Sequence, residues 1–308
     1  MRSGFLVVDK NVGARSTSCV GVIRNILGKN TRVGHGGTLD STACGVLVIL
    51  VGKATRTSQF VMNLPKLYRV IVRLGVKTTT DDMSGEIISR TDYVNVQEGS
   101  IDKVICSMTG LREQVPPAVS AVRVQGSRAH SIARKGIVPD LSPRIVMISS
   151  IRRIGPISRE AEFPMEIRCH KGTYIRSIVR DIGTMIGCGA AVSFLQREEI
   201  GPFNKVNAIP FENIPASGRN FLLDNLLSVS SIGEWFTTYR VKDGNPAMVL
   251  SGRPVPLSLL ERISWGKFEA RGMVVIEGPE FVTFGTISLS GGVPAVLPST
   301  TIEIGEID

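Results

Sequence analysis

Histidine and cysteine are scarce in this sequence of 308 residues, which contains three histidines and five cysteines. The cysteines are scattered, odd in number and never spaced as Cys-x-x-Cys. This distribution argues against a structural zinc site and against the disulfide framework of a small secreted protein. We therefore predict that the protein binds no metal and works in a reducing compartment, the cytoplasm.

Long hydrophobic runs are also lacking. Asp9 and Lys10 interrupt the first apolar run, so we expect no signal peptide there. The other apolar runs are far shorter than a membrane-spanning helix, so we expect no transmembrane helix. Apolar residues make up 43% of the chain and charged residues 20%, as in ordinary globular proteins. A chain of this length has room for one large domain and a small one.

Acidic residues are the minority among the charges, with 27 Asp and Glu against 36 Lys and Arg and a net charge of +9. The isoelectric point is about 9.6. Such a balance favours a polyanionic partner, with nucleic acid first and an anionic membrane surface second. The alternative to a polyanionic partner is a basic surface with no binding role.

One polar stretch, residues 33–45, combines a single acid, Asp40, with a single imidazole, His35, among four glycines. Glycines allow positive φ angles and a close approach of the backbone to a ligand. The apolar run 46–51 follows and predicts a buried strand that would hold this loop still. Two interpretations stay open at this point: a reactive site, or an ordinary loop in which Asp40 caps a helix. A Walker phosphate loop is excluded, because Ala54 stands where that motif needs Ser or Thr.

The rest of the chain alternates between strand and helix patterns. Strands are expected at 4–9, 66–75 and 163–169, and helices at 16–27, 54–62 and 94–109, with a further helix ending near 186. Between 78 and 88, Asp81 and Asp82 indicate a solvated turn rather than a metal site. After residue 228, short β-branched runs predict a small all-β domain, and one of these runs is 247–252.

Residues 117–144 carry five basic side chains against one acid, together with glycines, prolines and little apolar content. The basic residues are Arg123, Arg128, Arg134, Lys135 and Arg144. A segment of this composition cannot bury a core of its own, so it predicts a mobile basic loop.

Several segments resemble, in the same order, the motifs of the TruB family of tRNA pseudouridine synthases. They lie between residue 4 and about residue 212, and the main ones are Gly34-His-Gly-Gly-Thr-Leu-Asp40, Lys66-Leu-Tyr68, Gln114-Val-Pro-Pro-Ala-Val-Ser-Ala121 and Lys171-Gly-Thr-Tyr-Ile-Arg176. The resemblance implies an α+β fold, with a pseudouridine-synthase-like mixed and antiparallel sheet, flanking helices and an inserted thumb loop at about 117–144. It also implies a catalytic domain over 1–227 and a small β-rich, PUA-like RNA-binding domain over 228–308.

The family isomerises uridine to pseudouridine, and the resemblance implies action on the T-loop uridine at position 55 of tRNA. Asp40 would be the nucleophile, Tyr68 would stack on the flipped base and help to remove the C5 proton, and Arg176 would keep Asp40 ionised. The implied substrate-binding residues are His35, Tyr68, Tyr174 and Leu195, and the implied phosphate-binding residues are Arg123, Arg128, Arg134 and Lys135. The resemblance implies no metal, organic cofactor, guide RNA or protein partner, and we expect a monomer.

The sequence departs from the family pattern at Asn11, Ser41, Val119 and His130, where Pro, Pro, Tyr and an aromatic residue are usual. Two alternatives therefore stay open. The first is an RNA-binding folding chaperone with incidental or lost catalysis, which the intact Asp40, Tyr68 and Arg176 argue against. The second is a guide-RNA-dependent rRNA pseudouridine synthase of the dyskerin type, which the inserted basic segment argues against.

Overall fold

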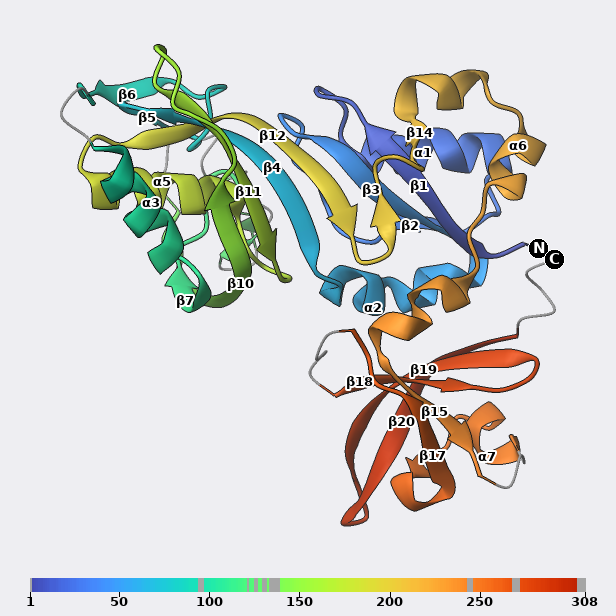
Figure 1. The fold of residues 1–308 in the computed structure, drawn as a ribbon. Coiled ribbons are helices and arrows are strands. Elements are labelled where there is room, and N and C mark those ends of the chain that lie inside the picture. The colour runs from blue at the N-terminus through green and yellow to red at the C-terminus, as the bar shows by residue number, and fades with distance from the viewer. Residues whose placement is uncertain are drawn as a thin grey trace. The chain divides into compact units, whose positions relative to one another are not determined.

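The computed structural model describes residues 2–93, 97–120, 122–124, 127–128, 132, 139–242, 246–267 and 272–303. The chain divides into two compact units (Figure 1). The terminal unit consists of residues 1–64 and 199–308, and the central unit consists of residues 65–198. The domain boundary predicted at 227/228 therefore lies inside the terminal unit. Among the described residues, no helix is long and apolar enough to cross a membrane.

The N-terminal part of the terminal unit contains paired strands of mixed direction and a helix that covers them. Strand β1 (Gly4–Lys10) pairs antiparallel with β3 (Cys44–Val51), and β2 (Val33–His35) pairs with the other edge of β3. A short strand, β14 (Ile209–Pro210), runs parallel to β1. Helix α1 (Ser16–Leu27) was predicted from its apolar face, and its Cys19 and Ile23 are buried against this sheet. Gly28, with a φ of 101°, ends the helix.

The C-terminal part of the terminal unit is a sheet of six strands in the order β16-β20-β19-β18-β15-β17. Their bounds are β15 Thr237–Val241, β16 Val255–Pro256, β17 Leu260–Ser264, β18 Met273–Glu277, β19 Phe281–Ser290 and β20 Val293–Glu303. The predicted all-β character is confirmed for 273–276 and 281–287. The prediction for 247–252 was wrong, because helix α7 (Ala247–Leu250) begins directly after Pro246. A short apolar run fits either structure, and proline favours the start of a helix.

The two parts of the terminal unit share one core. The predicted helix 54–62 is a 3-10 turn, η1 (Gly52–Thr57), followed by α2 (Ser58–Asn63). Phe60 of α2 meets Phe236 and Phe284 in edge-to-face contacts, with ring centroids 5.3 and 4.9 Å apart. The same cluster includes Phe5 of β1 and is completed by η3 (Val229–Trp235). The C-terminal strands are therefore packed onto the N-terminal sheet and are not joined to it by a linker alone.

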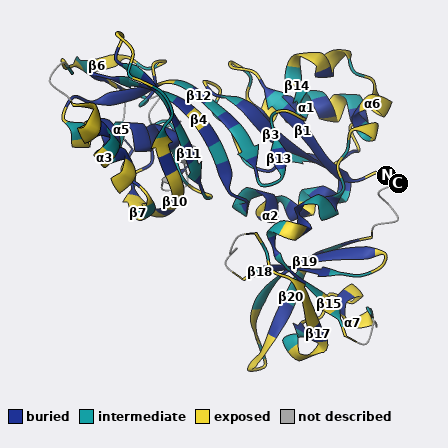
Figure 2. Cartoon of the chain, viewed as in Figure 1, coloured by how far each residue is buried: buried dark blue, intermediate teal, exposed yellow. Residues whose placement is uncertain are grey.

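The strands of the central unit follow one another in the order β12-β4-β11-β10-β7. The bounds are β4 Lys66–Leu74, β7 Gly110–Gln114, β10 Arg144–Arg153, β11 Glu162–Cys169 and β12 Ala190–Ile200, whose last two residues belong to the terminal unit. Burial alternates along β4 and β11, as period-two strands with one covered face require (Figure 2). Helices α3 (Glu98–Ser107) and α5 (Ile175–Ile186) lie against this sheet (Figure 1). A small hairpin of β5 (Val76–Thr78) and β6 (Ile87–Arg90) projects after β4.

The basic segment is an insertion between two neighbouring strands of the central unit. Gln114, the last residue of β7, pairs with Arg144, the first residue of β10. The chain therefore leaves and re-enters the sheet at one point. Within the segment, β8 (Arg123–Val124) pairs with β9 (Ser127–Arg128). His130, Arg134 and Lys135 lie outside the described residues.

Candidate active site

The loop that carries Asp40 is anchored on both sides to the turn between β1 and α1. The Ser16 hydroxyl donates to Leu39 O and accepts from the Leu39 N–H, both at 3.0 Å. On the other side, the Gly13 N–H donates to Ser41 O at 2.7 Å. Ser16, the first residue of α1, thereby fixes the residue before Asp40. The half-buried carboxylate thus sits on a backbone held at both neighbouring residues.

Lys10 makes this turn rigid in a way that offsets the missing proline at Asn11. Its side chain is fully buried at the end of β1. Its ammonium donates to the carbonyl oxygens of Asn11 and Ala14 at 3.0 Å each, and to that of Ala43 at 2.6 Å. Two of these charge-assisted bonds hold the β1–α1 turn, and the third ties it to the far side of the Asp40 loop.

His35 lies on β2, so the prediction that it sits in an irregular loop was wrong. Its ring is half-buried, and its Nδ1 accepts from the Gly37 N–H at 3.3 Å. The next residue must be glycine, because a Cβ on Gly36 would lie 2.2 Å from Cγ1 of Val61. Gly37 has a φ of 137°, which glycine tolerates best. These glycines let the chain turn sharply between the strand and Asp40.

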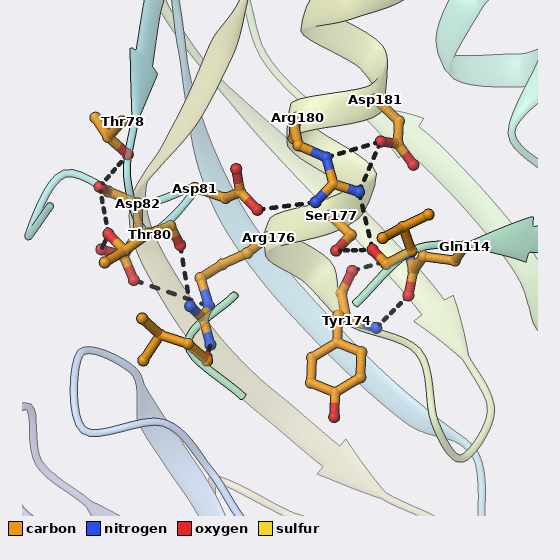
Figure 3. Close-up of polar contacts among 12 residues, drawn as sticks. Thr78, Thr80, Asp81, Asp82, Gln114, Tyr174, Arg176, Ser177, Arg180 and Asp181 are labelled. Atoms are coloured by element: carbon orange, nitrogen blue, oxygen red, sulfur yellow. Dashed lines mark hydrogen bonds and ion pairs between the residues drawn. The ribbon is translucent and has the colours of Figure 1, made fainter. Parts of the chain in front are cut away.

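In the central unit, Arg176 is held by a network of acceptors on two other segments. Its guanidinium donates to Thr80 O and to Val119 O, both at 3.0 Å (Figure 3). Its Nε lies 3.8 Å from Oδ2 of Asp82, and both side chains are almost completely buried. The Thr80 hydroxyl donates to Oδ1 of Asp82 at 2.7 Å. Arg176 therefore has a fixed direction rather than the freedom of a surface arginine.

The prediction of a solvated turn at Asp81 and Asp82 was wrong. Asp82 is only 5% exposed, and the Asp81 carboxylate forms an ion pair with Arg180 of α5 at 3.0 Å. Burial raises the pKa of Asp81, while Arg180 and then Arg176 act against that rise. The turn packs onto α5, and the arginines that pair with it lie far away in the sequence. Local composition therefore could not predict that the turn is buried.

Tyr174 is positioned through its main chain by Gln114. The Tyr174 N–H donates to Oε1 of Gln114 at 2.8 Å, and Nε2 of Gln114 donates to Tyr174 O at 3.1 Å. Gln114 itself is buried at the root of the insertion, and the Tyr174 ring points away from it (Figure 3). Sequence reasoning matched Gln114 to a motif but assigned it no role. The role of Gln114 is visible only in the structure, because its partner Tyr174 lies 60 positions further along the chain.

The predicted site residues are distributed over both units. Asp40 and His35 belong to the terminal unit, whereas Tyr68, Tyr174, Arg176 and Leu195 belong to the central unit. Tyr68 on β4 and Leu195 on β12 are both buried. Arg123 and Arg128 lie on β8 and β9, and Arg134 and Lys135 are outside the described residues.

The fold resembles one chain in the crystal structure of a Cbf5-Nop10-Gar1 complex, with a TM-score of 0.72 and 24% identity. The match covers 98% of this chain and 84% of that chain. Residues 24–175 match the model of the TruB family pseudouridylate synthase N-terminal domain. The solved structure shows an α+β fold with a PUA-like C-terminal β domain. Together with the family model and the relatives described next, it defines the class of this protein as a pseudouridine synthase, which is an isomerase.

Named relatives show which family within this class the chain belongs to. The chain is 37% identical to tRNA pseudouridine synthase B of Thermotoga maritima over 276 residues, which is 89% of this chain and 86% of that protein. It is 41% identical to tRNA pseudouridine synthase B of Synechococcus sp. (strain WH7803) over 215 residues, covering 70% of this chain and 71% of that protein. The chain belongs to the TruB family.

Proposed function

We propose that this enzyme converts the T-loop uridine at position 55 of tRNA to pseudouridine and needs no guide RNA. The observation that carries the proposal is the anchored Asp40 loop in a chain whose relatives are named tRNA pseudouridine synthase B. The net charge of +9 supports an RNA substrate. A cytoplasmic location, a monomeric state and independence of metals and cofactors are part of the same proposal.

The reaction moves one bond on the base. The N1–C1′ glycosidic bond breaks, a C5–C1′ bond forms, the C5 proton leaves and N1 gains a proton. No electrons are transferred to another molecule, so a nucleophile, a proton acceptor and an exposed base are sufficient. Asp40 supplies the nucleophilic carboxylate in this proposal.

The base must leave the stacked loop before it reacts, at a cost of a few kcal/mol. Tyr68 returns part of that cost by stacking on the uracil, which is worth about 1–3 kcal/mol, and it assists removal of the C5 proton. Tyr174 and Leu195 line the uracil pocket, and His35 occupies the gap that the base leaves. The positive charge of Arg176 favours the ionised form of the nucleophilic carboxylate.

The basic insertion and the C-terminal sheet bind the body of the RNA in this proposal. Arg123, Arg128, Arg134 and Lys135 bind phosphates, which gives affinity without sequence information. Beside α7 in the C-terminal sheet lies a hollow of about 430 Å³ whose walls include Met248, Arg253 and Leu259. A cation next to apolar walls suits a nucleotide, and this supports an RNA-binding role for that part of the chain.

The test is an activity assay with an unmodified tRNA transcript, no guide RNA and uridine labelled with tritium at C5. We expect release of the label and a single pseudouridine at position 55. Asp40→Asn should abolish release and leave tRNA binding within about threefold, because a neutral amide keeps the shape but not the nucleophile. Asp224→Asn is the matched control, since Asp224 lies in the same unit with a side chain 66% exposed.

Two outcomes would contradict the proposal. Full turnover by Asp40→Asn would show that Asp40 is not the nucleophile. Tight tRNA binding by a wild-type protein that makes no product without a guide would favour the chaperone or the guided alternative.

A further inference from the structure

Arg180 lies one helical turn after Arg176 on α5, and the roles proposed above do not use it. Positions four apart lie on the same face of a helix, so both arginines face the segments packed on α5. Nη1 of Arg180 lies 3.0 Å from Oδ2 of Asp81. Its Nη2 donates to Val115 O at 2.9 Å, and its Nε donates to the neighbouring Asp181 at 3.0 Å (Figure 3).

Asp81 holds a backbone conformation that a non-glycine residue adopts at a cost. Its φ is 60°, in the left-handed region, where Asp is tolerated better than most residues. This conformation accompanies two consecutive carboxylates that both pair with α5, Asp81 with Arg180 and Asp82 with Arg176. Asp81 O also accepts from the Val192 N–H at 3.0 Å, and the Met83 N–H donates to Val192 O at 2.9 Å. The 78–85 loop is thus fastened to β12 by its backbone and to α5 by its side chains.

The second contact of Arg180 reaches the root of the basic insertion. Val115 follows directly after β7, and its carbonyl accepts from both Arg180 and the Ser177 hydroxyl, the latter at 2.8 Å. Arg176 contacts the same insertion four residues later, at Val119 O. The two arginines therefore make the same pair of connections, one to the 78–85 loop and one to the insertion.

We propose that Arg180 is a positioning residue for the isomerisation: by fastening Asp81 and Val115 to α5, it holds both anchors of Arg176 and so fixes the direction of that guanidinium. The inference rests on the function proposed above. It predicts an effect on turnover, because a small misplacement of a group that stabilises the reacting carboxylate slows chemistry more than it weakens binding of a large RNA.

The ordinary alternative is an ion pair that only stabilises the fold. The chain offers a matched control of that kind in Arg153, which forms a two-pronged pair with Asp102 of α3 at 2.8 Å for both contacts. Arg153 lies in the same unit, and its side-chain contacts within the described part of the chain are with Glu98, Asp102 and Gly155, away from the 78–85 loop and the insertion root. Loss of either arginine removes a comparable pair, and only loss of Arg180 should affect turnover.

The experiment compares Arg180→Met, Arg180→Lys, Asp81→Asn and Arg153→Met with the wild type, using kcat and KM on the guide-free tRNA transcript and urea unfolding. We expect Arg180→Met to lower kcat by about ten- to a hundredfold and to change KM by less than about threefold. Asp81→Asn should lower kcat in the same direction, and Arg180→Lys should restore part of it. Combining Arg180→Met with Asp81→Asn should lower kcat by less than the product of the single effects, since the two residues act through one contact.

Amide hydrogen exchange tests the same idea without activity. The Met83 and Val192 amides should exchange faster in Arg180→Met than in the wild type, and at the wild-type rate in Arg153→Met. The proposal is overturned if Arg180→Met keeps kcat within about twofold, or if Arg153→Met loses as much kcat as Arg180→Met. If the wild type makes no pseudouridine, the proposed function fails. Unchanged exchange at these amides in Arg180→Met would then refute the anchoring role as well.

Discussion

Lys66, two residues before Tyr68, makes folding stability depend on pH in a way that one substitution can reveal. It is the first residue of β4, lies opposite Cys169 on β11, and is only 6% exposed. Burial lowers the pKa of its ammonium from 10.5 to about 7, and the nearby charge of Arg197 adds to this lowering. The folded protein therefore holds this proton much less tightly than the unfolded chain does.

The sign of the effect follows from proton binding. Below pH 7, Lys66 is charged in both states, and the cost of burying that charge is present in full. Between about pH 7 and 10.5, the unfolded chain keeps the proton while the folded protein loses it. The free energy of unfolding therefore rises with pH in this window, by at most about 1.4 kcal/mol per pH unit. The whole span corresponds to a ceiling of about 5 kcal/mol.

The measurement is urea unfolding of the wild type and Lys66→Met at several pH values between 7.5 and 10. Met keeps the length of the side chain but cannot carry a charge. We expect the stability of the wild type relative to Lys66→Met to increase steadily with pH. Any hydrogen bonds lost with the ammonium shift the curve by a constant and leave its slope unchanged. Burial raises the pKa of Cys169 to about 12, so this thiol stays neutral in the folded protein across the window. Its ionisation in the unfolded chain is common to the wild type and Lys66→Met and cancels in their comparison.

Lys103→Met is the control for a general effect of removing a lysine, since Lys103 is exposed on α3. It should show the pH dependence of the wild type. Parallel curves for the wild type and Lys66→Met would refute the reasoning, because they would mean that Lys66 titrates equally in both states.

Two further predictions concern the terminal unit and the insertion. Phe60→Ala should lower the free energy of unfolding by about 3–5 kcal/mol, because the ring holds Phe236 and Phe284 against α2; Phe60→Leu should cost less, and a loss below about 1 kcal/mol in Phe60→Ala would contradict the shared core. Replacing Arg128 and Arg134 together by Ala should flatten the plot of log K for tRNA against log salt by about 1.4–1.8, since each would release one phosphate contact. An unchanged slope, measured by titrations at several salt concentrations, would show that neither side chain touches phosphate.

Local patterns in the sequence were sufficient for most helices and strands and for the candidate nucleophile. β1, α1, β4 and β11 were predicted because period-two and helical spacing of apolar residues depends on neighbours only. The Asp40 motif was equally visible, because its glycines meet a requirement of the backbone within a few residues. Short runs without a distinctive period were the weak point, as the misassigned strand at 247–252 shows.

Contacts between distant segments were decided by the tertiary structure alone. The sequence by itself determined a buried strand after the Asp40 loop, a basic insertion and the family motifs. It did not predict that Asp81 and Asp82 would form ion pairs within the fold, because their partners Arg180 and Arg176 lie about a hundred positions away. Nor could it show that Gln114 would position Tyr174, or that Phe284 would share a core with Phe60. Polar side chains of the same type are stable in water or in a buried network, and only the fold brings the partner that decides between them.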